Sequence, residues 1–433
     1  MQGMPFETSE FARRRVAVIG GGVSGMAAAH LLARDHAVVL FESEKRLGGH
    51  ARTVLAGKRG DQPVDTGFIV FNKVNYPHLT RLFDELKVPV VKSDMSFGAS
   101  VRGGRLEYGL KDLKAVFAQK RNALDPRFLN MLMDVLRFNA HAMEHADDPR
   151  MTIGELLARL ELGNWFRDYY LLPISGAIWS TPSRGILDFP AQAMLRFFEN
   201  HALLSHTGQH QWYTVAGGSV EYVSRLQASM ASRGVDLRLG AGVAGVRREG
   251  GGVRVRAEGG DWEAFDEVIF ATHSDDTLRL LSDATEAERS ALGSVRYQPN
   301  RAVLHSDTSV MPKRRAAWAS WVYLEPEDPQ APIDITYWMN SLQPIPEDDP
   351  LFVTLNGNRQ VREELVHDVV TFRHPVYDLA AQLGVAALRM MNGERQTWFA
   401  GAWMRNGFHE DGFASAVDVV EAMRRRAATP VAA

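Results

Sequence analysis

Apolar residues gather near the start of the chain in a short run and then repeat with helical spacing. The run VAVI at residues 16–19 is rich in β-forming residues and ends in a glycine-rich stretch at residues 20–25. The next residues, SGMAAAHLLARD, have the composition of a buried helix, and AVVLFE at residues 37–42 is a second apolar run. The pattern predicts a strand, a helix and a second strand over residues 14–42.

Further along the chain the pattern changes several times. Residues 64–72, VDTGFIVFN, are expected to form a strand that returns to the first unit, and residues from Tyr76 to about Leu204 are mostly helical in pattern. Residues 235–272 return to strands and hairpins. Residues 300–357 alternate apolar strands with proline- and acid-rich turns, as in an antiparallel meander. A last strand, QTWFAG, leads to a closing helix at residues 415–427.

The glycines of the first turn fit a dinucleotide site. Gly20, Gly22 and Gly25 match G-x-G-x-x-G, and Glu42 lies 22 residues after Gly20, where an acidic residue can bind ribose hydroxyls. Glycines allow the tight turn and the approach of a pyrophosphate to the backbone, and the helix N-terminus favours an anion. The stretch GAGVAG at residues 240–245 matches too, but an alternating pattern follows it. We expect a hairpin there and no second dinucleotide site.

Composition excludes several classes of protein. The 433 residues are 45% hydrophobic and 23% charged, and the net charge of −3 argues against a general nucleic-acid binder. The absence of cysteine excludes disulfides, thiolate metal sites and a flavin attached through cysteine. No apolar run reaches the length of a membrane span, and residues 1–15 lack the apolar core of a signal peptide. We therefore expect a cytoplasmic protein.

The residues after Glu42 carry a resemblance to a known superfamily. Arg46, Gly48, Gly49 and Thr53 fit the R-x-G-G-R-x-x-T/S motif of FAD-dependent amine oxidases and phytoene desaturases, with His50 in place of the second arginine. Similar blocks follow in the same order: Asp65 to Gly67, TVAGGSVEYV with its helix and strand, VIFATH, and WFAGAWMRNGFHEDGFASA at residues 398–416. The chain resembles this superfamily over most of its length. The resemblance implies that FAD is held tightly. It leaves open whether FAD is attached covalently through a histidine.

The resemblance also implies a fold and a set of cofactor contacts. The fold class is α/β: a Rossmann-like FAD-binding domain of the glutathione-reductase type at residues 11–75, 205–298 and 392–430, interleaved with a substrate domain. That domain combines a helical insertion at residues 76–204 with an antiparallel sheet at residues 299–391. The residues assigned to FAD are Gly20, Gly22, Val23, Ser24, Gly25, Glu42, Ser43, Arg46, Gly48, Gly49, His50, Thr66, Gly67, Phe68, Val243, Ala271, Thr272, Gly401, Asp411, Gly412 and Phe413.

A narrower resemblance concerns the substrate. The stretches IWSTPSRGILDFPAQAMLRFFENHALL and HQWYTVAGGSVEYV are similar to bacterial flavoproteins associated with cyclopropane-fatty-acid synthases, which include a desaturase of methylated fatty acids. This similarity implies dehydrogenation of a fatty-acyl or phospholipid chain, including one methylated in mid-chain, by hydride transfer to flavin N5. An amine or amino-acid oxidase remains an alternative, because Arg196, Arg301 or Arg373 could bind a carboxylate. An isoprenoid or porphyrinogen oxidase and a flavoprotein partner of a lipid methyltransferase are further alternatives.

The superfamily resemblance and the need for an apolar site indicate candidate residues near the substrate. The region of residues 371–378 is expected to return to the flavin, which makes His374 and Tyr377 candidates for catalysis, together with His409 in the C-terminal motif. A histidine could move a proton near neutral pH. An acyl chain needs an apolar site, and the aromatic candidates are Trp179, Trp212, Trp321, Tyr323, Tyr337 and Phe372. Alternation places Trp321 and Tyr323 on one strand face, whereas Tyr337 and Trp338 must lie on opposite faces.

Two further sequence patterns bear on ligand binding. His201, His206 and His210 fit no common zinc spacing, so we expect no metal. Residues 110–128 are basic and partly amphipathic, with five lysines and arginines against two aspartates. They could rest on anionic lipid of the inner membrane or form an ordinary solvated face.

Overall fold

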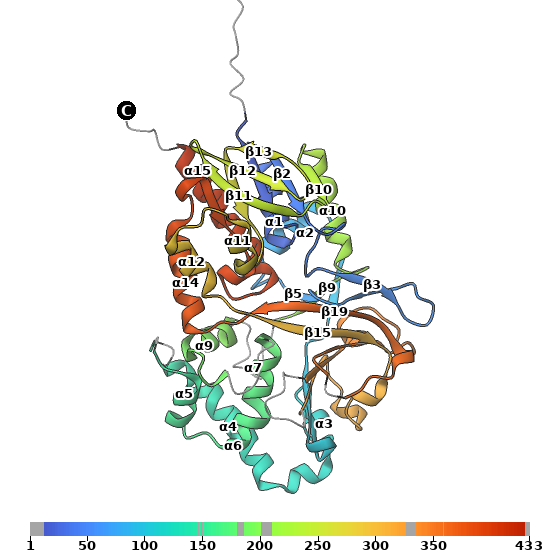
Figure 1. Cartoon of the computed structure of the whole chain (residues 1–433). Coiled ribbons are helices and arrows are strands. Elements are labelled where there is room, and N and C mark those ends of the chain that lie inside the picture. Colours follow the sequence, from blue (N-terminus) through green and yellow to red (C-terminus); the bar gives the residue numbers. More distant parts are fainter. Residues whose placement is uncertain are drawn as a thin grey trace, which may run out of the picture. The chain divides into compact units, whose positions relative to one another are not determined.

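The computed structural model describes residues 13–145, 147–148, 150–179, 186–200, 210–325, 334–357 and 359–428. Its contacts divide the chain into two compact units (Figure 1). Unit 1 comprises Met1–Gly49, Leu226–Leu292 and Ala387–Ala433, and unit 2 comprises His50–Arg225 and Gly293–Ala386. Of the residues expected to belong with the dinucleotide domain, the described residues 50–75 and 210–225 fall in unit 2.

Unit 1 is built on a parallel sheet that confirms the α/β prediction. The strands lie in the order β10-β2-β1-β14-β20, and all four neighbouring pairs are parallel. Their bounds are β1 Arg15–Ile19, β2 Ala37–Glu42, β10 Asp236–Leu239, β14 Glu267–Phe270 and β20 Thr397–Phe399. Residues 16–19 of β1 are buried, as in a sheet covered on both faces.

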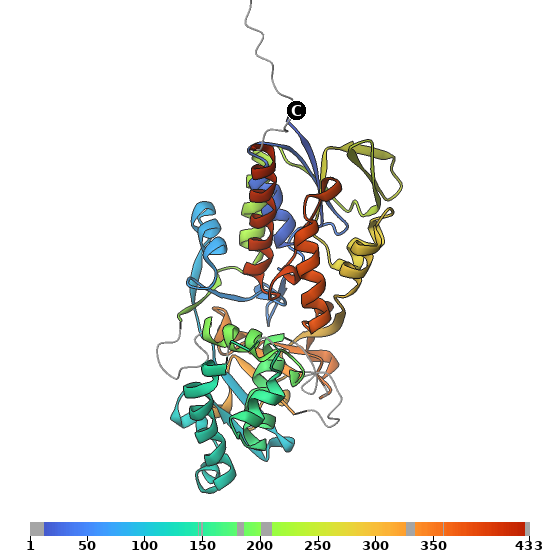
Figure 2. The same ribbon diagram turned by 90° about the vertical axis from the view of Figure 1, so that its left-hand side faces the viewer.

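Helix α1 (Val23–Leu32) connects β1 to β2, as the sequence predicts. Its side chains are almost all small or apolar and buried, which matches a helix enclosed by its neighbours. The long C-terminal helix α15 (His409–Ala428) packs alongside α1 in both views (Figures 1 and 2). Unit 1 also contains α11 (Ser274–Leu280) and the start of α12 (Glu286–Gly293).

The second glycine pattern leads into a hairpin and not into a helix. Strands β11 (Val243–Glu249), β12 (Gly252–Ala257) and β13 (Trp262–Phe265) form an antiparallel sheet, with the turn at residues 250 and 251. No helix N-terminus therefore follows residues 240–245. The structure confirms the expected hairpin.

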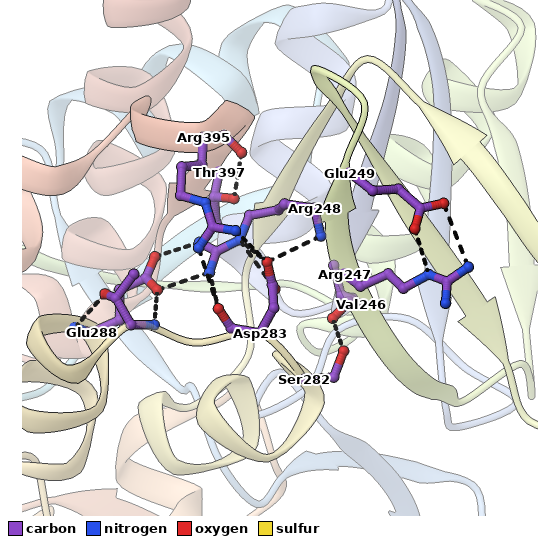
Figure 3. A network of polar contacts seen from close by, with 10 residues as sticks. Val246, Arg247, Arg248, Glu249, Ser282, Asp283, Glu288, Arg395 and Thr397 are labelled. Carbon is purple, nitrogen blue, oxygen red and sulfur yellow. Dashed lines mark hydrogen bonds and ion pairs between the residues drawn. The ribbon is translucent and has the colours of Figure 1, made fainter.

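A buried ion-pair network fastens the β11 hairpin to the rest of unit 1 (Figure 3). The Arg248 guanidinium donates to the Asp283 carboxylate at 3.1 Å and to both carboxylate oxygens of Glu288, one of them at 2.9 Å. Arg395 donates to Asp283 at 2.6 Å from the loop before β20. The side chains of Arg248 and Glu288 are 2% and 6% exposed, so this pair is shielded from water, whereas Asp283 and Arg395 at the edge of the network are 27% and 44% exposed.

Unit 2 is built on a seven-stranded sheet in the order β19-β15-β18-β17-β16-β7-β8. The strands are β7 Phe97–Val101, β8 Leu106–Gly109, β15 Tyr297–His305, β16 Trp321–Leu324, β17 Asp334–Trp338, β18 Phe352–Leu355 and β19 Val366–Pro375. β16, β17 and β18 form the expected meander, but β15 pairs with β18 and β19 instead of with β16. The pair of β16 and β7 is parallel.

Two small sheets complete the strands of unit 2. One pairs β3 (Thr53–Ala56) with β4 (Gln62–Asp65), and the other has the order β5-β9-β6, with β5 Val70–Asn72, β9 Trp212–Val215 and β6 Val90–Ser93. The prediction of a single strand at residues 64–72 is therefore wrong, because Thr66 to Ile69 are not in a strand and separate β4 from β5. The mostly helical pattern expected from residue 76 also missed β6, β7 and β8.

The remaining part of the insertion is helical as expected. The helices are α2 Pro77–Leu86, α3 Leu113–Val116, α4 Pro126–His141, α5 Ile153–Arg159, α6 Asn164–Phe166, α7 Leu172–Trp179 and α9 Ala191–Asn200. Phe138 of α4 packs against the rings of Phe166 and Phe198, which ties α4, α6 and α9 together. Helices α10 (Val220–Ser232) and α14 (Leu379–Met391) contribute residues to both units. Among the described residues, we find no helix with the length and hydropathy needed to cross a membrane.

Candidate cofactor and substrate site

Two glycines of the first turn are required by packing inside unit 1. Gly20 has a φ of +104°, and a Cβ there would lie 2.8 Å from the carbonyl oxygen of Ala271. A Cβ on Gly25 would lie 1.8 Å from the carbonyl oxygen of Gly20. The first glycine therefore allows the turn and the third allows α1 to start directly against β1.

Gly22 is different, because nothing in the protein requires it to be glycine. Its φ is −72°, which any residue can adopt, and a Cβ on it would meet no atom within 4 Å. It is also the N-cap of α1, where its missing side chain leaves the N-terminal N–H groups uncovered. Open space at a glycine beside a helix N-terminus fits the close approach of a pyrophosphate to the backbone.

Two other glycine-rich segments meet this turn. The Gly48 N–H donates to the Gly21 carbonyl at 2.9 Å, and a Cβ on Gly49 would lie 3.1 Å from the Gly22 Cα. A Cβ on Gly412 would lie 2.6 Å from a methyl carbon of Val23, so the first turns of α15 and α1 are in contact. Two helix N-termini that meet in this way favour an anion between or beside them.

Glu42 lies beside the same turn at the end of β2. Its Oε2 accepts the Gly21 N–H at 2.6 Å, and its Oε1 accepts the Glu44 N–H at 2.8 Å and the Ser43 hydroxyl at 3.1 Å. A carboxylate offers about four acceptor positions, so ribose hydroxyls can still bind. The Ala241 N–H donates to the Glu42 carbonyl at 2.8 Å, which brings the segment leading to Val243 to this point.

Arg46 belongs to the same segment as the paired glycines. Its guanidinium donates to the Gly49 carbonyl at 3.1 Å and forms an ion pair with Glu44 at 3.0 Å. The side chain therefore shapes the turn at residues 48 and 49. Its contact with a phosphate stays a prediction.

The C-terminal motif contains two polar contacts that the sequence did not single out. The Ser415 hydroxyl accepts the Gly401 N–H at 2.9 Å and donates to the Gly412 carbonyl at 2.8 Å. The Trp403 indole N–H donates to the Thr272 carbonyl at 3.0 Å. Ser415 and Trp403 both lie within the superfamily motif at residues 398–416, and this motif is the sequence feature that could have identified them.

Asp411 and Phe413 lie in the first turns of α15. The Asp411 carboxylate accepts the Phe408 N–H at 2.9 Å, and burial raises the pKa of this carboxyl to about 6. Phe413 is buried. Taken with the glycine contacts, the residues of unit 1 fit a bound dinucleotide.

In unit 2, Asp65 holds several of the superfamily blocks together. Its buried carboxylate accepts from the Thr53 hydroxyl at 2.6 Å, the Ser219 hydroxyl at 2.7 Å and N–H at 2.9 Å, and the Gln343 amide at 3.0 Å. Burial raises the pKa of Asp65 to about 6, although these donors oppose the rise. This network links residues 50–75 and 219 to the large sheet and explains their place in unit 2.

His50 begins the segment that pairs with Thr66 to Phe68. The Phe68 N–H donates to the His50 carbonyl at 3.0 Å, and a Cβ on Gly67 would lie 1.9 Å from that carbonyl oxygen. The Thr66 N–H donates to the Arg52 carbonyl at 2.9 Å, and Arg52 pairs with Asp368 at 2.6 Å. Gly67 is therefore glycine because two backbones approach closely there.

His374 is held by a chain of amides. The Asn300 amide nitrogen donates to His374 Nδ1 at 2.9 Å, and the Asn356 amide donates to Asn300 Oδ1 at 2.7 Å. Rings surround His374, with His50 at 5.6 Å between centroids and Phe372 at 6.5 Å. Burial, with a smaller effect of His50, lowers the pKa of His374 to about 3.

The proton-carrying role expected of His374 stays a prediction. With Nδ1 accepting from Asn300, the ring proton lies on Nε2, and the low pKa keeps the imidazole neutral near pH 7. A neutral Nε2–H can donate a hydrogen bond. The replacement of arginine by His50 also removes a fixed positive charge from beside this ring.

Three of the expected substrate residues lie in one apolar cluster of unit 2. Phe372 is buried there, and the partly exposed Trp321 and Tyr337 pack against it and meet edge to face at 5.3 Å. Trp338 packs in a separate cluster with Phe352, which confirms that Tyr337 and Trp338 lie on opposite faces. Other partly buried members of the first cluster are Val54, Ile69, Val70, Met95 and Val370.

The other candidates lie elsewhere. Tyr323 is buried further along β16, and Trp212 packs against Tyr76 on a different sheet. The side chain of Trp179, like His201 and His206, lies outside the described residues, whereas His210 is half-buried. Tyr377 is half-buried after β19 in unit 2, and His409 begins α15 with residues of unit 1.

Comparisons with known proteins agree with this geometry. The family described as flavin containing amine oxidoreductase matches residues 23–421. Over 100 residues, the chain is 36% identical to the FAD-dependent oxidoreductase dbaF of Emericella nidulans, a match that covers 23% of this chain and only 20% of that protein.

Solved structures of similar fold include cyclohexylamine oxidase from Brevibacterium oxydans IH-35A, with a TM-score of 0.68, 14% identity and coverage of 95% of this chain and 100% of that one. A fatty acid isomerase from P. acnes that produces CLA has a TM-score of 0.67 and 15% identity, with 94% and 98% coverage. At such identities the likeness shows the fold alone.

Proposed function

The chain belongs to the flavin-containing amine oxidoreductase family and is an FAD-dependent oxidoreductase, and from this premise we propose that it dehydrogenates a fatty-acyl or phospholipid chain. A chain methylated in mid-chain is included in the proposal, because the narrower sequence resemblance points to such lipids. When bound, FAD supplies the redox chemistry by accepting the electrons of the broken C–H bonds. The protein has to hold the chain, keep water away and orient the reacting carbon.

The observation that carries the proposal is the apolar cluster around Phe372, Trp321 and Tyr337. The side chains of its partly exposed members are aliphatic or aromatic. Covering such apolar surface with an acyl chain lowers the free energy. The imidazole of His374 borders Phe372 and is neutral, so it adds a single hydrogen-bond donor and no charge. This combination suits a long uncharged substrate with one polar group.

The arginines considered for a carboxylate substrate do not support the amino-acid oxidase alternative. Arg196 and Arg301 are exposed, and Arg373 alternates with Phe372 and His374, which places it on the opposite face of β19. Its guanidinium lies over the ring of Tyr297 at 5.4 Å. A carboxylate clamp needs a buried arginine that faces the substrate, and these three do not provide it.

Anaerobic mixing tests the proposal directly. The yellow holoprotein is mixed without oxygen with methylated phospholipids, with unmethylated phospholipids and with amines, and the visible absorbance of the flavin is followed. We expect loss of the oxidised flavin spectrum with a phospholipid. Bleaching by amines alone would contradict the proposal, and bleaching by no substrate would favour a flavoprotein partner of a methyltransferase.

A matched pair of tryptophans tests whether the apolar cluster holds the substrate. Trp321→Ala removes a partly exposed ring from the cluster that contains Phe372, and Trp338→Ala removes one from the opposite face. We expect Trp321→Ala to slow lipid-dependent bleaching by about tenfold or more, as loss of a large apolar contact implies, while Trp338→Ala stays near the wild-type rate. Equal effects of the two variants would mean that the cluster is structural.

A further inference from the structure

The segment of residues 110–137 in unit 2 exposes more apolar surface than its fold requires. It includes α3, a 3-10 turn at Lys120–Leu124 and most of α4 (Figure 1). Five of the twelve large apolar side chains that are exposed among the described residues belong to it. They are Leu113 at 78%, Leu124 at 87%, Leu129 at 39%, Met133 at 60% and Leu136 at 48%.

On α4 these side chains form a continuous stripe. Leu129, Met133 and Leu136 are spaced by four and three residues, and Ala140 continues the series. At about 100° per residue the four lie within about 60° of one another around the helix. The opposite side carries Phe128, Met131 and Phe138, which are buried. The stripe is thus the face of α4 that the rest of unit 2 does not cover.

The charge of the segment is opposite to that of the chain. It contains six lysines and arginines against three aspartates, a net charge of +3, whereas the whole chain carries −3. The three aspartates accept backbone N–H groups: Asp112 that of Ala115 at 2.8 Å, Asp125 that of Arg127 at 3.0 Å and Asp134 that of Gly163 at 3.0 Å. Asp125 and Asp134 also form ion pairs with Arg127 at 2.8 Å and Arg137 at 3.5 Å. Lys114, Lys120 and Arg121 are exposed.

Neighbouring cations enlarge this basic surface. The Arg121 guanidinium donates to the carbonyl of Arg105, and Lys313 Nζ donates to the Gly103 carbonyl at 3.5 Å. The Gln119 amide donates to the Gly104 carbonyl at 2.8 Å, which fixes the 3-10 turn to the same place. Arg105 and Lys313 are both exposed.

We propose that residues 110–137, together with Arg105 and Lys313, dock unit 2 on an anionic lipid membrane. Leucine and methionine side chains beside exposed lysines and arginines are the composition of an interfacial surface, because the apolar groups enter the headgroup boundary while the cations meet anionic lipids. A second copy of this chain suits the surface less well, because a symmetric contact would bring two positive surfaces together. The proposal does not depend on the substrate.

Vesicle sedimentation of the full-length holoprotein tests the proposal. The probes are phosphatidylcholine vesicles with and without phosphatidylglycerol, at low and at high salt. We expect sedimentation with the anionic vesicles at low salt and release by high salt. Leu129→Ser/Met133→Ser/Leu136→Ser and Lys114→Glu/Lys120→Glu should each reduce the bound fraction by about tenfold or more.

The control variant removes exposed apolar side chains from a different helix. Leu383→Ser/Met390→Ser changes residues of α14 that are 64% and 82% exposed, and it should bind like the wild type. Thermal unfolding and retained flavin absorbance show that each variant is folded. No sedimentation of the wild type at low salt, or equal losses in all variants, would overturn the proposal. A dimer that the triple serine variant dissociates, without vesicle binding, would assign the surface to a second copy.

Discussion

Gly22 and Gly25 lie three residues apart in one turn, yet the protein constrains them differently. A Cβ on Gly25 would overlap the Gly20 carbonyl oxygen at 1.8 Å, whereas a Cβ on Gly22 would meet nothing within 4 Å. The third glycine of the motif is therefore a requirement of the folded chain alone. We predict that the second is required by the bound cofactor, and this difference can be measured.

We expect Gly22→Ala to weaken FAD binding and to leave the apoprotein nearly unchanged. The added methyl group would occupy the space where the pyrophosphate approaches, and affinity should fall by about tenfold or more. The apoprotein should lose less than about 1 kcal/mol, the usual cost of alanine at an N-cap. FAD titration of the apoprotein and its thermal unfolding measure the two effects.

Gly25→Ala is the matched comparison for this prediction. Because its Cβ collides with backbone, α1 must move away from β1, and the apoprotein should lose stability by about 2 kcal/mol or more before FAD is added. If Gly22→Ala bound FAD as tightly as the wild type, the pyrophosphate would have to lie elsewhere.

At the scale of elements, the Arg248 network shows how a buried ion pair joins segments that are distant in sequence. Arg248 comes from β11, Glu288 from α12, Asp283 from a loop and Arg395 from the 3-10 turn Glu394–Gln396 (Figure 3). Burial would raise the pKa of Glu288 by itself, but the hydrogen bonds from Arg248 lower it. The carboxylate therefore depends on Arg248 for its charge.

Arg248→Met should destabilise the protein by about 3–5 kcal/mol, because it leaves the buried Glu288 carboxyl without the guanidinium that stabilises its charge. The double variant Arg248→Met/Glu288→Met should recover most of this loss, since no unpaired charge remains. Urea unfolding measures both. The control is Arg254→Met, which breaks an exposed pair with Glu249 and should change the free energy of unfolding by less than about 1 kcal/mol. A loss in Arg248→Met no larger than in the control would contradict the prediction.

The elements that sequence patterns predict well are those stabilised by near neighbours. The unit from β1 to β2 could be predicted because its apolar runs, its glycines and Glu42 fall within 29 residues, 14–42, and pair with one another. The hairpin of β11 and β12 was predictable for the same reason. The position of β15 was not, since the residues with which it pairs in β18 and β19 come about 50 to 80 positions later and leave no local sign.

The same distinction between local patterns and distant pairing applies to the site residues. The superfamily motifs point to Gly20, Gly48, Gly401 and Gly412, and the structure brings these residues together in unit 1. Asn300 and Asn356 could not be predicted because an asparagine inside a strand pattern carries no motif. Only the pairing of β15 with β19, in which Asn300 lies opposite Phe372, brings Asn300 within hydrogen-bond distance of His374. The low pKa of His374 could not be predicted from the sequence pattern either, because it comes from burial, which depends on tertiary packing.

At the scale of the whole molecule, buried titratable groups make stability depend on pH in opposing directions. His305 is fully buried in unit 2, where its Nδ1 accepts the Asp307 N–H at 3.1 Å and its Nε2 bonds the Thr354 hydroxyl at 2.8 Å. Burial lowers the pKa of His305 from 6.5 to about 4, whereas burial raises that of Asp65 from 3.8 to about 6. Both groups change charge between pH 4 and 6.5.

The signs follow from which state binds more protons. Between pH 6.5 and 4 the unfolded chain protonates His305 more readily than the folded protein does, so this contribution to stability is complete above pH 6.5 and is lost as the pH falls. For Asp65 the folded protein holds the proton more strongly, so its contribution is complete below pH 3.8 and is lost as the pH rises through about 6. The wild-type pH dependence should therefore be shallow in this window.

Replacing one group at a time should show the separate pH dependence that each group contributes. The measured quantity is the free energy of unfolding of the apoprotein in urea, from pH 7 to pH 4. His305→Gln cannot titrate, so its deficit relative to the wild type should shrink as the pH falls, by about 3 kcal/mol in total for a pKa shift of this size. Asp65→Asn should show the opposite trend, with a deficit that grows toward pH 4, because only the wild type gains stability from protonation there. A deficit of His305→Gln that stayed constant over this range would mean that the buried imidazole titrates as it does in the unfolded chain, and that the bonds to Asp307 and Thr354 do not keep it neutral.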